Sequence, residues 1–135
     1  MAETFQIEIV TPEKLVVKDE AEEAQIPGKN GYLGILPGHA PLISELGVGE
    51  ITYRKGGTTT HLSVAWGFAE VLSDKLTILA EVAERAEEID ITRANKARDR
   101  AEEQLKSSNP ETDFESAKSA LARAETRLKV AEKAR

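Results

Sequence analysis

The sequence predicts an α+β protein in which a β-sandwich is followed by a helical hairpin. All nine glycines lie between Gly28 and Gly67, among short runs of β-prone residues. Residues 90–135 contain no glycine and are rich in alanine, arginine, lysine and glutamate, which favour helices. A chain of 135 residues has room for one domain and a small appendage. We therefore expect a sandwich domain over residues 1–84 and a helical regulatory arm over residues 85–135.

Seven to ten short strands are expected in the first part. Residues 5–10 alternate apolar and polar side chains, as a strand with one buried face does. Glycine and proline turns bound the other expected strands, which are residues 15–17, 23–26, 32–36, 47–55, 58–66, 67–72 and 76–80. Residues 40–46 are expected to form a loop, because Pro41 argues against a central strand. Strands at this spacing indicate a sandwich or a flattened barrel.

Two single residues of the first part have ordinary predicted roles. Trp66 is the only tryptophan and is expected to pack in the core. His39 directly follows a turn and has no second histidine nearby in the sequence. A hydrogen-bonded turn or interface role is therefore favoured over metal binding for His39.

Two helices are expected in the second part. Asp90 can cap a helix that reaches about Ser107, and a capping box of Thr112 and Glu115 begins the second helix. Residues that recur every three or four positions form the inward faces: Ile91, Ala94, Arg98, Ala101 and Leu105, then Phe114, Ala117, Leu121, Ala124, Leu128 and Ala131. Because alanine occupies alternate inward positions, the antiparallel helices would share a thin apolar seam. The arm is therefore expected to be movable.

The charges are distributed unevenly along the chain. Residues 1–84 carry 13 acidic and six basic side chains, whereas residues 118–135 carry six basic and two acidic ones. A basic last helix on an acidic protein implies an acidic partner surface or a phosphate ligand. The alternative is that these charged side chains simply lie on a helix face exposed to water and bind no partner.

The sequence favours a regulatory or coupling protein over an enzyme. It has no cysteine, no Ser/His/Asp set at an identifiable spacing, and no glycine-rich phosphate-binding motif. No run approaches the ~20 apolar residues that span a bilayer, and the first ten residues do not resemble a leader. We expect no required cofactor, no metal site and no nucleic-acid partner.

Four arginines of the predicted arm form two pairs along helix faces. Arg93 and Arg100 are seven positions apart, and Arg123 and Arg127 are four apart. In an antiparallel hairpin these faces can converge, and guanidinium groups suit phosphate oxygens. The alternative is that the arginines pair with neighbours such as Glu102, Glu103 and Glu125.

Three segments resemble the epsilon subunit of rotary ATP synthases, in the expected order and over almost the whole chain. Residues 26–42 read IPGKNGYLGILPGHAPL, residues 67–71 read GFAEV, and residues 77–90 read TILAEVAERAEEID. The resemblance implies a ten-stranded β-sandwich followed by a two-helix hairpin. Because the first residues do not resemble a presequence, we expect a form from a bacterium, a cyanobacterium or a plastid genome, with the cyanobacterial form favoured.

The resemblance implies a central-stalk function and a set of protein partners. The sandwich would bind the gamma subunit and the loops of the c-ring, through Gly31, Tyr32, Leu33, His39, Pro41 and Leu42. The arm would extend into the catalytic head and block ATP hydrolysis. Its contacts with an acidic segment of the beta subunit, and with the alpha subunit, would involve Lys118, Arg123, Arg127, Lys129 and Lys133. The chain would meet the membrane only through the complex, on the cytoplasmic or stromal face of a plasma or thylakoid membrane.

The resemblance also implies a regulatory ATP site. Some family members bind ATP in the folded hairpin through an I-D-x-x-R-A motif, and residues 89–94 read IDITRA. The candidate ATP-binding residues are Glu84, Ile89, Asp90, Arg93, Ala94, Arg100, Arg123 and Arg127. The alternative function is a stand-alone, nucleotide-responsive sensor, which would not co-purify with a gamma subunit.

Overall fold

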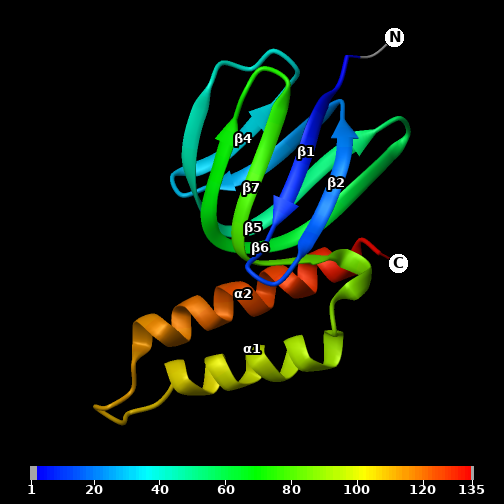
Figure 1. Ribbon diagram of the computed structural model, residues 1–135. Coiled ribbons are helices and arrows are strands. Elements are labelled where there is room, and N and C mark those ends of the chain that lie inside the picture. The colour runs from blue at the N-terminus through cyan, green and yellow to red at the C-terminus, as the bar shows by residue number, and fades with distance from the viewer. Residues whose placement is uncertain (1–2, 135) are drawn as a thin grey trace.

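A computed structural model describes residues 3–134 as seven strands followed by helices (Figure 1). The strands are β1 (Phe5–Val10), β2 (Leu15–Ala21), β3 (Glu23–Gly28), β4 (Gly31–Ile35), β5 (Leu42–Lys55), β6 (Thr58–Val71) and β7 (Lys75–Arg85). The 3-10 helix η1 (Ala86–Glu88) leads into α1 (Ile91–Leu105) and α2 (Phe114–Glu132). The α+β class and the helical hairpin are therefore confirmed.

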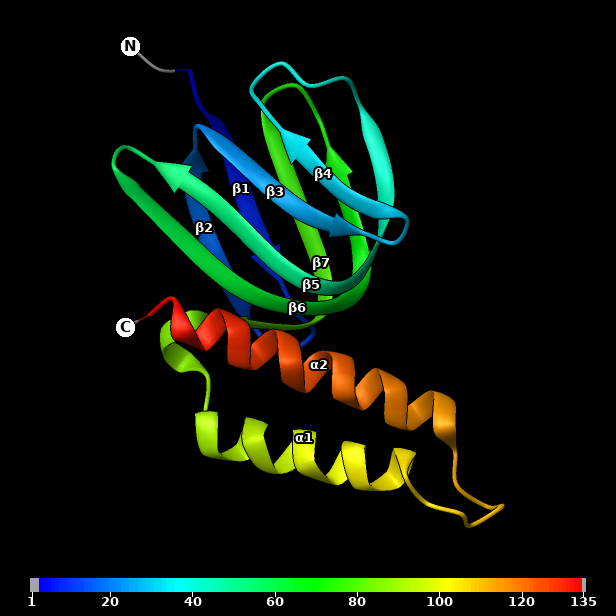
Figure 2. The ribbon, with the colours of Figure 1, turned by 180° about the vertical axis from the view of Figure 1, so that it is seen from behind.

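The seven strands form one sheet that curls over itself into two layers (Figures 1 and 2). Their order is β2-β1-β7-β6-β5-β3-β4, and the pairing of β1 with β7 is parallel while the other pairings are antiparallel. The two layers enclose one apolar core. Its largest fully buried side chains are Ile7, Ile9, Val17, Ile26, Ile35, Ile51, Leu62, Val64, Val71, Leu76 and Ile78.

Seven strands fall within the seven to ten expected from the residues, whereas the ten that the resemblance implies is not the observed count, because two strands continue through the bend of the sheet. β5 and β6 each run for 14 residues, and both contain positions where a break was expected. The expected loop at residues 40–46 is likewise wrong, since β5 begins at Leu42. Pro41 lies just before that strand, where its missing N–H removes no bond from the sheet.

The bend of β6 is made at two residues with positive φ angles. Gly67 has φ +126°, and a Cβ there would collide with the carbonyl oxygen of Leu79 on β7, so the bend requires glycine. Trp66 has φ +55°, an uncommon conformation for a bulky residue. The expectation that Trp66 packs in the core is wrong, because this bend leaves its side chain only partly buried, on the side of the arm.

The two helices of the arm begin at aspartate caps. The Asp90 carboxylate accepts a hydrogen bond from the Arg93 N–H at 3.1 Å, as predicted. The predicted Thr112–Glu115 capping box is wrong, because Asp113 caps α2 by accepting from the Ser116 N–H at 3.0 Å. Aspartate is a stronger cap than threonine.

The seam between α1 and α2 is as thin as the sequence predicts. Its fully buried residues are the alanines Ala94, Ala101, Ala117 and Ala124. The Phe114 side chain at the start of α2 remains 40% exposed, although the sequence placed it on the inward face. Helix–helix contact therefore contributes little buried apolar area.

Helix α2 lies between α1 and the sandwich (Figures 1 and 2). It packs against β5, β6 and η1. A small apolar cluster of Ala86, Ile89, Val130 and Ala131 fixes the end of α2 beside the segment that links arm and sandwich. This cluster is separate from the sandwich core, so the arm is held on the sandwich by a few apolar side chains and by polar contacts.

Candidate functional site

A cleft of about 660 Å³ lies between the hairpin and the adjacent end of the sandwich. Its walls come from the β1–β2 turn, from β6 and β7, and from both helices. Four cationic and four anionic side chains line it: Lys14, Arg93, Arg123 and Arg127, then Glu13, Glu81, Glu84 and Glu88. The cleft thus gathers charges of both signs from distant parts of the chain.

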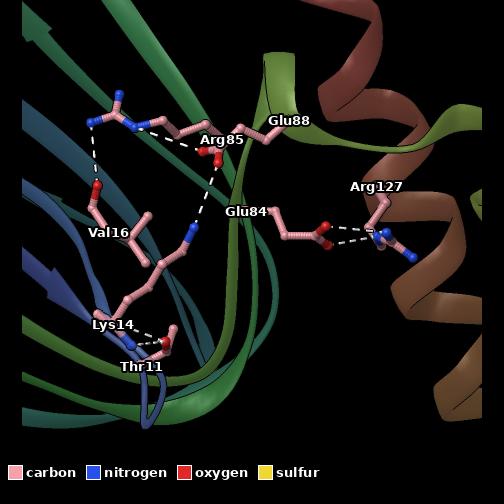
Figure 3. Close-up of polar contacts among 7 residues, drawn as sticks. All are labelled: Thr11, Lys14, Val16, Glu84, Arg85, Glu88 and Arg127. Atoms are coloured by element: carbon pink, nitrogen blue, oxygen red, sulfur yellow. Dashed lines mark hydrogen bonds and ion pairs between the residues drawn. The ribbon is translucent and has the colours of Figure 1, made fainter.

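Arg127 and Glu84 join the arm to β7 across this cleft (Figure 3). The Arg127 Nε lies 2.7 Å from Glu84 Oε1, and Nη2 donates a hydrogen bond to Oε2 at 3.2 Å. The two side chains are only 18% and 28% exposed. An ion pair shielded in this way is screened by salt less than a surface pair.

The start of the arm is tied to the β1–β2 turn (Figure 3). Lys14 in this turn places its Nζ 3.6 Å from Glu88 Oε2, and Arg85 Nε lies 4.0 Å from Glu88 Oε1. Arg85 Nη2 also donates to the Val16 carbonyl at 3.3 Å. These contacts hold η1 against the sandwich.

Arg123 lies over the indole ring of Trp66. The guanidinium carbon is 4.9 Å from the ring centroid, within the range of a cation–π contact. The positive φ of Trp66 accompanies this placement of the ring beside α2. Arg127 is therefore held by the carboxylate of Glu84, and Arg123 is held by the aromatic face of Trp66.

Lys133, the residue that ends α2, binds a polar pair on β5 and β6. Its Nζ lies 2.7 Å from Glu50 Oε1, while His61 Nδ1 lies 3.3 Å from Glu50 Oε2. The backbone N–H of Glu50 donates to the Tyr32 hydroxyl at 2.9 Å. The end of the arm is thus joined to a carboxylate that His61 of β6 also faces, on a residue whose backbone is bonded to β4.

The structure brings together part of the predicted nucleotide site. Glu84, Arg93, Arg123 and Arg127 line the cleft. The remaining predicted residues lie elsewhere: Asp90 caps α1, Ile89 is buried in the small apolar cluster, Ala94 is buried in the helix seam, and Arg100 is exposed on α1 outside the cleft lining.

The cations of the arm differ in their surroundings. Arg123, Arg127 and Lys133 contact the sandwich, whereas Lys129 is exposed and Lys118 pairs with Glu115 at 3.7 Å on the helix surface. None of the four arginines pairs with Glu102, Glu103 or Glu125 within residues 3–134. Arg135, which the sequence counts with the basic end, lies outside the described residues.

The predicted partner residues of the sandwich gather near the β3–β4 turn. Gly31, Tyr32, Leu33 and Leu42 line a second cleft of about 570 Å³. His39 and Pro41 belong to the connection between β4 and β5 and do not line it. Tyr32, at this cleft, is 59% exposed.

Sequence reasoning missed an apolar row on the outer face of the sheet. Val10, Leu15, Phe68 and Leu79 occupy one register row across β2, β1, β7 and β6, and we call them the outer apolar row. Leu15, Phe68 and Leu79 are 53–56% exposed. The sequence did contain a signal for this row. Side chains alternate between the two faces of a strand, so Leu79, between the buried Ile78 and Ala80, had to point outward.

Two further observations concern metal ions and membranes. Among residues 3–134, no group of three or more histidine, cysteine or carboxylate side chains is arranged to hold a metal ion. None of the described helices is long and apolar enough to cross a membrane.

Fold and cleft together define a class of small two-part proteins, a β-sandwich with a charged helical hairpin docked on one end. The family model described as "ATP synthase, Delta/Epsilon chain, beta-sandwich domain" matches residues 4–86. The model of the "long alpha-helix domain" of the same chain matches residues 87–132. The chain therefore belongs to the ATP synthase delta/epsilon family.

Bacterial relatives agree with this assignment. The ATP synthase epsilon chain of Koribacter versatilis (strain Ellin345) is 69% identical over 111 residues, which cover 82% of this chain and 78% of that relative. The epsilon chain of Solibacter usitatus (strain Ellin6076) is 47% identical over 133 residues, covering 98% of this chain and 99% of the relative. The epsilon chain of Geotalea daltonii is 48% identical over 134 residues, covering 98% and 97%.

Solved structures share the fold at low sequence identity. A chain of the Euglena gracilis mitochondrial ATP synthase (OSCP/F1/c-ring) matches with a TM-score of 0.80 and 21% identity, over 91% of this chain and 78% of that one. A chain of the Tetrahymena thermophila mitochondrial ATP synthase central stalk and c-ring matches with a TM-score of 0.56 and 14% identity, over 98% and 96%.

Proposed function

We propose that this chain is a central-stalk subunit of a proton-translocating ATP synthase, which couples rotation of the c-ring to the catalytic head. In this proposal the chain catalyses no reaction itself and restrains ATP hydrolysis through its arm. The family assignment and the names of the bacterial relatives support it. The complex would hold the chain on the cytoplasmic or stromal face of a plasma or thylakoid membrane, as a peripheral subunit.

The proposed regulation rests on one observation: three cations of the arm already contact groups of the sandwich in the folded chain. Arg123 and Arg127 of α2, and Lys133 at its C-cap, each contact one group of the sandwich. To bind Arg127, which is 18% exposed, an acidic segment of the beta subunit would have to displace Glu84, and α2 would have to leave the sandwich. Folded and extended arms would therefore compete for the same charges, and a partner shifts such a balance by its differential affinity.

The outer apolar row offers a surface for the gamma subunit. Val10, Leu15, Phe68 and Leu79 lie on adjacent strands, and Ile43 on β5 adds a 71% exposed side chain near them. Contiguous exposed apolar residues mark protein interfaces. The second cleft, with Tyr32 and Leu42 at its surface, would face the c-ring loops.

The test is an ATPase assay of the catalytic head with the full chain and with a chain that ends at Ala86. We expect both chains to bind the gamma subunit and only the full chain to inhibit hydrolysis. Equal inhibition by the two chains would contradict an inhibitory role of the arm. Failure of both chains to bind gamma would favour the alternative, a stand-alone nucleotide-responsive sensor.

A second proposal is that the cleft binds ATP as a regulatory ligand. Its volume and the cations Lys14, Arg93, Arg123 and Arg127 suit a polyphosphate. Lys14 comes from the β1–β2 turn and was not expected from the sequence. ATP binding would have to open the Arg127–Glu84 pair or share it, which reduces the net gain in free energy.

Titration of ATP into the isolated chain, followed by amide resonances of the arm, tests this second proposal. Arg93→Ala should weaken binding, because Arg93 lines the cleft. Arg100→Ala, on the exposed surface of the same helix, is the matched control. An equal loss with both variants would mean that ATP does not occupy this cleft as described.

A further inference from the structure

Trp66 has a backbone conformation that a residue with a bulky side chain does not favour. Its φ of +55° lies in the left-handed region, and Trp66 is the one non-glycine residue with a positive φ in the part of the chain that the structure describes. Such a conformation disfavours a residue of this kind by a factor of about 5 to 30 in population. Glycine would avoid this cost, so the indole ring has to make contacts that offset it.

The indole ring makes one such contact with the arm. The Arg123 guanidinium carbon lies 4.9 Å from the ring centroid, and α2 packs against β6. Trp66 is partly buried and does not belong to the apolar core of the sandwich. A cation over an aromatic face changes a population by about two- to fivefold at a partly exposed site. Release of α2 would remove this contribution and leave the backbone strain in place.

The pairing of β6 with its two neighbouring strands is interrupted at Trp66. Ala65 and Gly67 each pair with a residue of β5 and a residue of β7, and the register is the same before and after Trp66. Within residues 3–134, Trp66 itself is paired with no residue of either strand. A backbone rotation at Trp66 therefore disturbs the pairing of the sheet less than a rotation at either neighbour.

Gly67 connects Trp66 to the outer apolar row. Glycine takes φ angles of either sign, so Gly67, at φ +126°, can compensate for a rotation at Trp66. A Cβ at Gly67 would collide with the Leu79 carbonyl oxygen, so the glycine backbone packs directly on β7. Leu79 pairs with Phe68, and both belong to the outer apolar row. A rotation shared by Trp66 and Gly67 would therefore shift this row.

We propose that Trp66 is a strained link that couples docking of the arm to the conformation of the outer apolar row. With α2 docked, the contact with Arg123 holds Trp66 at positive φ. With α2 released, Trp66 relaxes to the negative φ of an ordinary strand residue. Gly67 then takes up the compensating rotation, and Phe68 and Leu79 move with it.

This coupling acts in both directions, because the two sites bias the same two-state element. A protein bound to the outer apolar row, which is the gamma subunit in the function proposed above, would favour one position of the arm by its differential affinity for the two states. The link itself is a property of the isolated chain and does not depend on that function.

Solution NMR of the full chain tests the link. The nuclear Overhauser effect between the HN and Hα protons of Trp66 reports the sign of φ, because these protons are closer at positive φ. The Cα resonances of Phe68 and Leu79 report the backbone of the outer apolar row. Arg123→Ala removes the ring contact, and Arg127→Ala weakens docking at a different contact. Lys129→Ala, which changes an exposed cation of the same helix, is the matched control.

We expect Arg123→Ala to raise the ratio of relaxed to strained Trp66 by about two- to fivefold. Arg127→Ala should move the Phe68 and Leu79 resonances in the same direction, because it populates the same released state. Lys129→Ala should leave these resonances in place.

A substitution of Trp66 itself separates the link from other routes. In Trp66→Gly the strain is absent, so adding Arg123→Ala should leave the Phe68 and Leu79 resonances unchanged. Trp66→Asn serves the same purpose if Trp66→Gly does not fold, since asparagine tolerates the left-handed region.

Two results would overturn the proposal. The first is a positive φ at Trp66 in every variant together with an unchanged outer apolar row, which would mean that the bend of β6 alone fixes this conformation. The second is a movement of Phe68 and Leu79 that persists when Arg123→Ala is added to Trp66→Gly, which would mean that the arm acts on this row by another route.

Discussion

At the residue scale, the hold of the sandwich on the arm is divided among a few contacts of different chemistry. Arg127 meets a carboxylate, Arg123 an aromatic ring and Lys133 a carboxylate shared with a histidine. Contacts of these kinds contribute about 0.5–2 kcal/mol each. The docked arm therefore has a small net stability, and a single substitution should alter its population measurably.

Arg123 allows a direct test of this division. Arg123→Ala removes the cation over Trp66 and should weaken docking by about 0.5–1 kcal/mol, or roughly two- to fivefold. The emission of Trp66 should shift to longer wavelength, because its ring becomes more exposed to water. Lys129→Ala changes an exposed cation on the same helix and should have no such effect. Equal shifts from both variants would contradict a specific ring contact.

Asp19 provides a residue-scale prediction about the sandwich itself. Its carboxylate accepts bonds from Lys55 at 2.9 Å and from the Tyr53 hydroxyl at 3.1 Å, joining β2 to β5. The hydrogen bond from Lys55 is the main cause that lowers the pKa of Asp19 below its ordinary value of 3.8. A lowered pKa contributes stability that is fully present above the ordinary value and is lost as pH falls towards the lowered one.

Asp19→Asn should therefore destabilise the sandwich by roughly 1 kcal/mol at pH 7. The difference from the unsubstituted chain should shrink as pH falls below 3.8. Urea unfolding at pH 7, 5 and 3 measures it. A difference that stays constant over this range would show that the carboxylate charge of Asp19 is not what stabilises the contact.

At the element scale, the two helices of the arm differ in their contact with the sandwich. α2 contacts the sandwich, and α1 packs on the far side of α2 (Figures 1 and 2). Because the seam between them consists of buried alanines, helix–helix packing contributes little, and the aspartate caps contribute about 1 kcal/mol each.

The cap of α2 can be tested against the residue that the sequence favoured. Asp113→Ala removes the acceptor of the Ser116 N–H and should destabilise α2 by about 1 kcal/mol. Thr112→Ala should cost less, because the Thr112 hydroxyl bonds to Ser107 in the loop and not to the helix. Amide exchange of residues 114–118 distinguishes the two variants. Greater loss of protection in Thr112→Ala than in Asp113→Ala would support the capping box that the sequence predicted.

Elements with a local signal could be predicted from the sequence, and those set by distant contacts could not. The spacing of the inward residues, mostly alanine and leucine, located both helices, and Asp90 located the start of the first. The continuity of β5 and β6 through their bend escaped prediction, because the glycines that normally end strands here permit a close approach between strands. The Glu84–Arg127 pair joins residues 43 positions apart, a distance over which spacing carries no information.

At the scale of the whole molecule, the two parts differ in how they are stabilised. The sandwich has one large apolar core, whereas the arm has alanines and a separate cluster of Ala86, Ile89, Val130 and Ala131. We expect a chain that ends at Ala86 to unfold cooperatively, with a melting temperature within a few degrees of the full chain. Calorimetry and far-ultraviolet circular dichroism measure this. An unfolded truncated chain would mean that the sandwich requires α2.

The two long strands have a mechanical consequence. β5 and β6 pass through the bend from one layer of the sandwich to the other, so the layers are joined by covalent backbone as well as by side-chain packing. Sliding one layer over the other would require breaking the hydrogen-bond ladder between these strands or distorting their backbones. The sandwich should accordingly resist shear, and a twisting load applied to one layer would reach the other with little lag. This torsional stiffness is the property that a part of a rotating shaft needs.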